Sequence, residues 1–152
     1  MRIGIAGMQT TELAAKSIQE ILSDAGFDSF YFRNNSKITM ADLVIVLGGD
    51  RGVRNYFHRA LDVDTPVLGI SESESNGVLA QIELKDLPSY LNRIKKQDYV
   101  IEDVPRIGVK VDGKNTYPVL NDVSVFTSKS ATLMEYILRV MMRRYGMIVV
   151  TV

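Results

Sequence analysis

The segment Leu43–Leu47 (LVIVL) constrains the fold of this chain more than any other stretch. Its apolar residues are continuous, whereas a strand with one face in water alternates apolar and polar residues. Such a strand is buried on both faces, as in a parallel sheet covered by helices on both sides. It runs directly into Gly48-Gly49-Asp50-Arg51-Gly52, and the residues from Val53 to about Leu61 are predicted to form a helix.

Shorter segments repeat this alternation of strand and helix. Strands are predicted at Met1–Gly7, Ser29–Phe32 and Pro66–Ile70, and a helix near Leu87–Lys96. Apolar residues at spacings of three and four predict another helix, which ends at Gly26 and whose apolar face consists of Leu13, Ala14, Ile18, Ile21, Leu22 and Ala25. The alternation predicts an α/β fold with an open parallel sheet and flanking helices.

The pattern changes near Lys96. β character prevails in Tyr99–Val111, Val119–Phe126, Thr132–Val140 and Tyr145–Val152. Asp112-Gly113 suits a two-residue hairpin turn, because both positions tolerate positive φ. We therefore expect an α/β domain over residues 1–97 and a partial antiparallel β domain over residues 98–152.

Composition excludes several function classes. The chain has 18 Lys and Arg against 18 Asp and Glu, so it lacks the basic excess of a dedicated nucleic-acid binder. It has no cysteine and one histidine, His58, which excludes disulfides, thiolate metal sites and multi-histidine metal sites. Its apolar runs are shorter than a signal peptide or a membrane span requires. We expect a cytoplasmic protein that binds neither nucleic acid nor membrane.

The glycine-rich turn after Leu47 is the first candidate site. Ligands of open α/β sheets bind beyond the carboxyl ends of the strands. Gly48, Gly49 and Gly52 would let the backbone approach a phosphate, and the next helix would present free amides to it. Asp50 would then point into the crevice and could take the proton of a bound hydroxyl. In the alternative interpretation, the glycines only form a tight turn and Asp50 only caps the helix.

Asn121-Asp122 is the second candidate site. Both residue types are disfavoured inside a β pattern, because their side chains compete with the backbone for hydrogen bonds. Adjacent strand residues face opposite ways, so the two side chains would have different roles. The alternative is a bulge or a strand end that faces solvent.

Together these motifs resemble the NAD kinase family, whose donors are ATP or inorganic polyphosphate. Leu47-Gly48-Gly49-Asp50 is similar to the family's GGDG motif and Asn121-Asp122 to its NE/D motif. Pro66–Ile70 is similar to its PVLGI strand, and Met134–Val140 to its strand after the NE/D pair. The resemblance covers nearly the whole chain.

The resemblance implies a role for each motif. Residues 1–97 would bind nucleotide, and Asp50 would be the base that acts on the adenosine 2′-hydroxyl of NAD. Gly48 and Gly49 would form the phosphate-accepting turn, Arg51 and Gly52 would continue it, and Asn121 and Asp122 would hold the NAD side of the site. Mg²⁺ would accompany ATP.

This chain departs from the family pattern in three places. Arg51 replaces the last glycine of GGDG. It would be strained if that position requires positive φ. Alternatively, Gly52 takes the turn and Arg51 clamps a phosphate or pairs with Asp50. The family's glycine–aromatic pair after PVLGI is matched only by Gly77-Val78. The family's glycine/threonine-rich motif would begin near Val152, so we expect a truncated product or a shortened relative.

Two other functions stay open on these residues. The chain could be a non-catalytic nucleotide-binding or interaction domain derived from such a kinase, or a lipid or sugar kinase of the same superfamily. We also expect a homo-oligomer, at least a dimer. A partial β domain leaves strand edges uncovered around Met134–Val140 and Tyr145–Val152, and such edges tend to pair.

Overall fold

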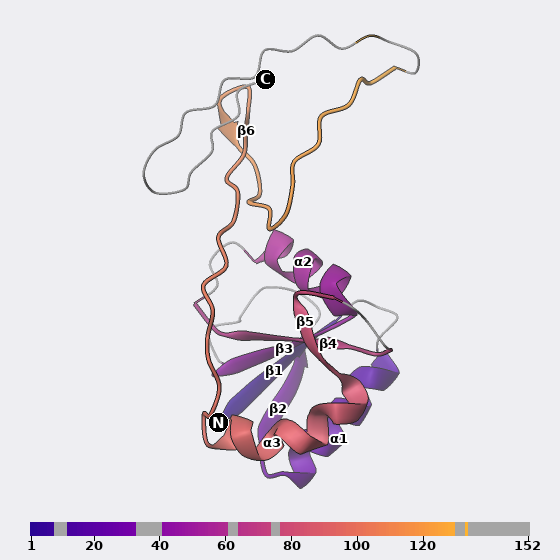
Figure 1. Ribbon diagram of the computed structural model, residues 1–152, viewed down its shortest axis with the longest axis vertical. Coiled ribbons are helices and arrows are strands. Elements are labelled where there is room, and N and C mark those ends of the chain that lie inside the picture. The colour runs from indigo at the N-terminus through magenta and orange to yellow at the C-terminus, as the bar shows by residue number, and fades with distance from the viewer. Residues whose placement is uncertain (8–11, 33–40, 61–63, 74–76, 130–132, 134–152) are drawn as a thin grey trace. The chain divides into compact units, whose positions relative to one another are not determined.

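Five parallel strands form one sheet in the order β2-β1-β3-β4-β5 (Figure 1). The strands are β1 (Arg2–Ala6), β2 (Asp28–Phe32), β3 (Leu43–Leu47), β4 (Val67–Ser71) and β5 (Ala80–Glu83). In this computed structural model, the described residues are 1–7, 12–32, 41–60, 64–73, 77–129 and 133. The chain forms two compact units, residues 1–104 and 105–152, and the sheet belongs to the first.

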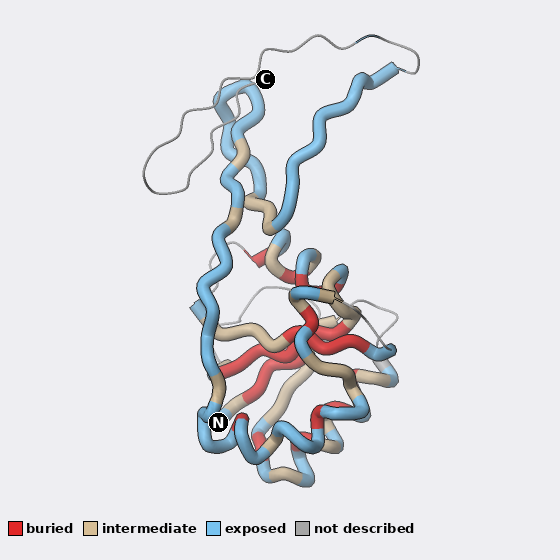
Figure 2. Tube along the Cα trace, viewed as in Figure 1, coloured by how far each residue is buried: buried red, intermediate tan, exposed pale blue. Residues whose placement is uncertain are grey.

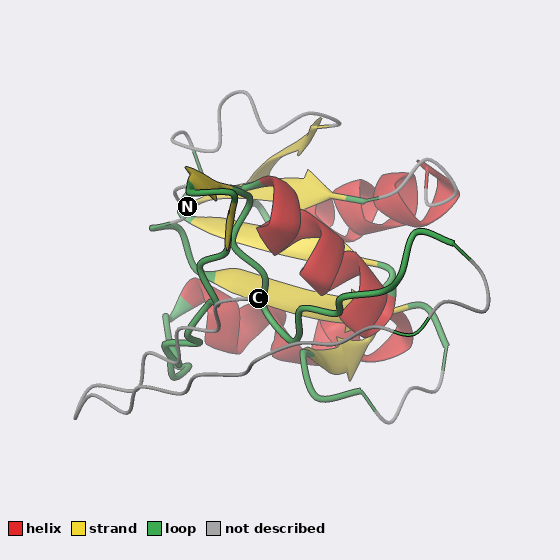
Figure 3. Ribbon diagram, turned by 90° about the horizontal axis from the view of Figure 1, so that it is seen from above, coloured by secondary structure: helices red, strands yellow, loops and turns green. Residues whose placement is uncertain are grey.

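Helices cover both faces of the sheet (Figure 3). They are α1 (Glu12–Asp24), α2 (Gly49–Arg59) and α3 (Leu87–Lys95), the last preceded by the 3₁₀ turn η3 (Leu84–Asp86). α1 and α3 lie on one face and α2 lies on the other. The parallel α/β architecture expected from the sequence is therefore confirmed. Within the described residues, no helix has the length and apolar character that a membrane span requires.

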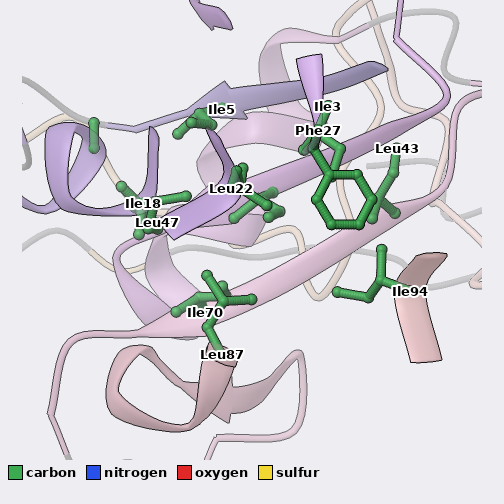
Figure 4. Packing of buried hydrophobic residues seen from close by; sticks show 12 residues of the cluster. Ile3, Ile5, Ile18, Leu22, Phe27, Leu43, Leu47, Ile70, Leu87 and Ile94 are labelled. Carbon is green, nitrogen blue, oxygen red and sulfur yellow. The ribbon is translucent and has the colours of Figure 1, made fainter. Parts of the chain in front are cut away.

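β3 is the central strand, and every one of its residues is buried (Figure 2). Leu43, Ile45 and Leu47 pack with α1 and α3, and Figure 4 shows Leu43 and Leu47 in this cluster. Val44 and Val46 point to the other face and pack with α2. Because each face of β3 meets a helix layer, no polar residue can alternate along this strand. This explains the continuous apolar run.

The apolar face of α1 differs from the expected one at Leu13. Its side chain is 82% exposed, whereas Ala15, Ile18 and Leu22 are buried. Leu13 lies nine positions before Leu22, which turns it to about the opposite side of a helix with 3.6 residues per turn. The helix ends as expected, with Gly26 in the left-handed region at φ 79°.

The second unit contains the expected hairpin. β6 (Lys110–Val111) pairs antiparallel with β7 (Lys114–Asn115). Asp112 and Gly113 form the turn with φ 50° and 76°, as a type I′ turn requires. An antiparallel bridge joins Ile107 to Val119.

The strand expected over Val119–Phe126 does not form beyond that bridge, and residues 121–126 are exposed. Among the described residues, no strand pairs with this segment to complete its hydrogen bonds beyond the bridge at Val119. The strands expected at Thr132–Val140 and Tyr145–Val152 lie outside the described residues. The boundary near residue 97 stays a prediction, and the two compact units divide between Val104 and Pro105.

The contrast between Leu22 and Leu13 predicts a difference in stability. Leu22→Ala is expected to lower the free energy of unfolding by about 2–5 kcal/mol, because it leaves a cavity in the core. Leu13→Ala removes the same atoms from an exposed side chain and should change it by no more than about 0.5 kcal/mol. Urea unfolding of both variants measures the difference. Equal losses would contradict the orientation of α1.

Candidate functional site

The glycine turn lies at the carboxyl end of β3. Gly48 and Gly49 have φ of 95° and 62°, a backbone conformation that side chains disfavour. α2 begins at Gly49, several residues before the expected start at Val53. The amide of Gly52 donates to the carbonyl of Gly48 over 2.9 Å. Asp50 and Arg51 therefore lie in the first turn of a helix, whose amides are available to an anion.

Gly52 has a packing role. A Cβ at this position would lie 1.9 Å from the carbonyl oxygen of Leu47, so only glycine lets α2 approach the end of β3 this closely. Gly52 does not take the turn, because the left-handed residues are Gly48 and Gly49. Arg51 is helical and requires no positive φ. The condition for strain at Arg51, a positive φ, is therefore not met, because α2 begins early.

The Asp50 side chain joins α2 to the start of β5. Its Oδ2 accepts the amide of Val78 over 2.9 Å. Its Oδ1 accepts the amides of Leu79 and Ala80 over 2.9 and 2.8 Å. Asp50 is thus half-buried and bonded to a distant segment of the chain. The interpretation that it only caps α2 does not describe these contacts.

These contacts lower the pKa of Asp50 below its ordinary value of 3.8. The Ala80 amide contributes most, burial acts in the opposite direction, and the amides of Val78 and Leu79 and the charge of Arg54 lower the pKa further. The carboxylate is therefore ionised at neutral pH. It can receive a proton or a hydroxyl hydrogen bond there, although a lowered pKa makes it a weak base.

α2 carries two arginines near Asp50 in the sequence. Arg51 and Arg54 are exposed, but only Arg54 contributes to the lowered pKa of Asp50. Arg54 was not a candidate from the sequence. The sequence pattern that could have identified Arg54 is its spacing of four residues from Asp50, which places the two side chains on the same side of a helix.

Besides Arg54, the backbone at Val78–Ala80 contributes to the site without being identifiable from the sequence. The sequence predicts a loop before a helix in this region, whereas the structure has the strand β5 there. The only sequence signal for it is the alternation in Ala80–Glu83. Gly69 on β4 makes room for this segment, because a Cβ there would lie 2.6 Å from the Leu79 carbonyl oxygen. Backbone amides have no residue signature, so sequence reasoning could not identify them as partners of Asp50.

Asn121 and Asp122 belong to the second unit. Both are exposed, and the Ser124 hydroxyl donates to Oδ2 of Asp122 over 3.3 Å. Gly48, Gly49, Asp50, Arg51 and Gly52 belong to the first unit. The first unit thus brings one part of the candidate site together, and the addition of Asn121 and Asp122 to it stays a prediction.

Metal-ligating side chains do not gather in the part of the chain that the structure describes. No group of three His, Cys, Asp or Glu residues there could hold an ion. Both oxygens of Asp50 already accept backbone amides. A metal ion at this turn would therefore depend on ligands that a bound molecule supplies, such as phosphate oxygens.

A family model described as "ATP-NAD kinase N-terminal domain" matches residues 8–99, more than half of the chain. Among curated proteins, an NAD kinase of Clostridium botulinum is 31% identical over 127 residues, which cover 78% of this chain and 44% of that protein. An NAD kinase of Clostridium perfringens is 32% identical over 114 residues, which cover 72% and 40%. The chain thus spans less than half the length of these relatives.

The fold has a counterpart among solved structures. The crystal structure of an NAD kinase from Archaeoglobus fulgidus in complex with ATP is similar with a TM-score of 0.54 and 19% sequence identity. The similarity covers 71% of this chain and 41% of that one. At this identity the likeness concerns the fold, and it agrees with the parallel sheet found here.

The close approach at Gly52 predicts an unusual stability effect. Glycine to alanine in a helix ordinarily stabilises by about 1 kcal/mol. At Gly52 the added methyl group meets the Leu47 carbonyl, so Gly52→Ala is expected to destabilise by about 1–3 kcal/mol. Gly108→Ala is the matched control, because a Cβ there meets no atom within 4 Å. Thermal and urea unfolding compare the two variants, and a stabilised Gly52→Ala protein would contradict this account.

Proposed function

Because this chain belongs to the ATP-NAD kinase family, we propose that it takes part in phosphoryl transfer from ATP to the adenosine 2′-hydroxyl of NAD. The observation that carries the proposal is the turn at Gly48-Gly49-Asp50, which follows the central strand. There an ionised carboxylate lies beside the free amides of a helix start. This combination suits a phosphate next to a hydroxyl group.

In the proposed reaction, the 2′-oxygen of NAD attacks the γ-phosphorus of ATP. Asp50 takes the hydroxyl proton as the new O–P bond forms, and the bond from the γ-phosphorus to the bridging oxygen breaks to release ADP. The turn at Gly48 and Gly49 with the start of α2 binds phosphate oxygens, and Arg51 adds a positive charge there. Asn121 and Asp122 would hold NAD.

ATP is the proposed donor, supported by the family and by the ATP complex of the Archaeoglobus protein. Mg²⁺ bound to the ATP phosphates would neutralise part of their charge. A substrate screen would compare ATP with inorganic polyphosphate as the donor. It would also compare NAD with lipids and sugars as the acceptor. Homo-oligomer formation and a cytoplasmic location stay expectations from the sequence.

A non-catalytic nucleotide-binding domain is the second candidate function. The three backbone amides on Asp50 favour it, because they leave the carboxylate a single lone pair, on Oδ2, and lower its pKa, which weakens it as a base. Such a domain would bind ATP or NAD without forming NADP. Turnover therefore separates the two functions, and binding alone does not.

Asp50→Asn is expected to lower kcat for NADP formation by about 10²–10⁴-fold, because an amide cannot accept the proton. The Kd for NAD should change little, since the side chain keeps its shape. Asp86→Asn, which changes an exposed carboxylate at the start of α3, is the matched control and should keep full activity. An unchanged kcat for Asp50→Asn would contradict the base assignment.

Arg51→Ala tests the phosphate contact. Loss of its charge beside the turn is expected to raise the KM for ATP by about tenfold, as for a charged hydrogen bond. The stability should stay nearly constant, because alanine is a good helix former. Arg59→Ala, at the far end of α2, removes the same exposed charge and should leave the KM unchanged. Equal effects of both variants would indicate general electrostatics instead of a phosphate clamp.

A further inference from the structure

The three amides on Asp50 divide unequally between its two oxygens. Oδ1 accepts both Leu79 and Ala80, whereas Oδ2 accepts Val78 alone. A carboxylate oxygen has two lone pairs for hydrogen bonds. Oδ1 is therefore fully used within the protein, and Oδ2 keeps one lone pair for another donor.

The segment that Oδ1 holds is the start of an edge strand. β5 has four residues, its only partner within the described part of the chain is β4, and its register with β4 shifts between Gly69 and Ile70. A short edge strand with an irregular register has few hydrogen bonds of its own. The two bonds that Leu79 and Ala80 donate to Oδ1 add to the few that fix the position where β5 begins.

The packing against β4 leaves little room for the backbone at the start of β5. A Cβ on Gly69 would lie 2.6 Å from the Leu79 carbonyl oxygen and 2.9 Å from the Cα of Ala80. β5 thus begins in contact with Gly69, and Asp50 binds the amides of the same two residues. The carboxylate therefore connects the start of β5 to the glycine turn.

We propose that the two oxygens of Asp50 have separate roles. Through Oδ1, Asp50 is a positioning residue that clamps Leu79 and Ala80 at the start of β5. Oδ2 is the oxygen that meets the hydroxyl group of a substrate. The role of Oδ2 rests on the proposed function, whereas the clamp through Oδ1 does not. With these separate roles, Asp50 can accept a proton through Oδ2 while Oδ1 keeps its hydrogen bonds from Leu79 and Ala80.

The division of roles predicts different effects of two substitutions. Asn at position 50 keeps one carbonyl oxygen, which can hold Leu79 and Ala80, and places its NH₂ group against the Val78 amide. Asp50→Asn should therefore leave amide hydrogen exchange at Leu79 and Ala80 within about threefold and release only Val78. Asp50→Ala removes all acceptors and should speed exchange at Leu79 and Ala80 by about tenfold or more.

An acid titration of the unmodified protein tests the clamp even if Asp50→Ala fails to fold. The lowered pKa means that the clamp is complete above the ordinary value of 3.8 and is lost as the pH falls through the lower folded value. The amide proton shifts of Val78, Leu79 and Ala80 should move together with one midpoint below 3.8. Arg54 is the charged side chain that shifts this midpoint, so Arg54→Ala should raise it.

Asp42→Asn is the matched control for both measurements. Oδ2 of Asp42 also accepts a backbone amide, that of Arg2, over 2.6 Å, but it lies beside the opposite ends of the strands. The amides of Val78–Ala80 should exchange and titrate normally in this variant. The clamp is overturned if these amides keep their exchange rates in a folded Asp50→Ala protein, or if they do not titrate together in the unmodified protein.

Steady-state kinetics test the role of Oδ2 separately. Asp50→Asn should lower kcat and keep the KM for NAD, whereas Asp50→Ala should also raise the KM because the start of β5 is released. Equal KM values in the two variants would overturn the division of roles. If no NADP forms from the unmodified protein, the proposed function and the role of Oδ2 are overturned, and the exchange data alone decide the clamp.

Discussion

The burial of β3 on both faces is the constraint on which the rest of the first unit depends. Leu43, Ile45 and Leu47 anchor one helix layer and Val44 and Val46 anchor the other. A strand fixed from both sides has little freedom, so the chain that leaves it starts from a fixed point and direction. The position of the turn at Gly48 and Gly49 is therefore fixed as well. A site that binds phosphate would require such a fixed backbone.

The same constraint explains why glycine recurs where the layers meet. At Gly52 the helix presses on the carbonyl of Leu47, and at Gly69 a strand and a helix approach the backbone at once. These glycines allow contact distances that a Cβ would prevent. Local packing and the candidate site are therefore built from the same positions, and a change that loosens the packing also moves Asp50.

Asp50 connects this rigid centre to the edge of the sheet. Its carboxylate lies in the first turn of α2 and accepts hydrogen bonds from Val78 and Leu79, which precede β5, and from Ala80, its first residue. The charge that suits it to a hydroxyl group also suits it to backbone amides. In the proposed reaction the same carboxylate would also meet a hydroxyl group, which would link the chemistry of the site to the order of β5.

The sequence by itself determined four of the five strands of the parallel sheet, its central strand, the three helices and the hairpin at Asp112-Gly113, because hydrophobic periodicity and turn chemistry are local properties. It also identified Gly48, Gly49 and Asp50 as the candidate turn. Only the tertiary structure decided that α2 begins at Gly49, that Leu13 faces away from the core and that Asp50 binds three amides about thirty residues later in the chain. These features depend on contacts between segments distant in sequence, and backbone amides leave no trace in residue identity.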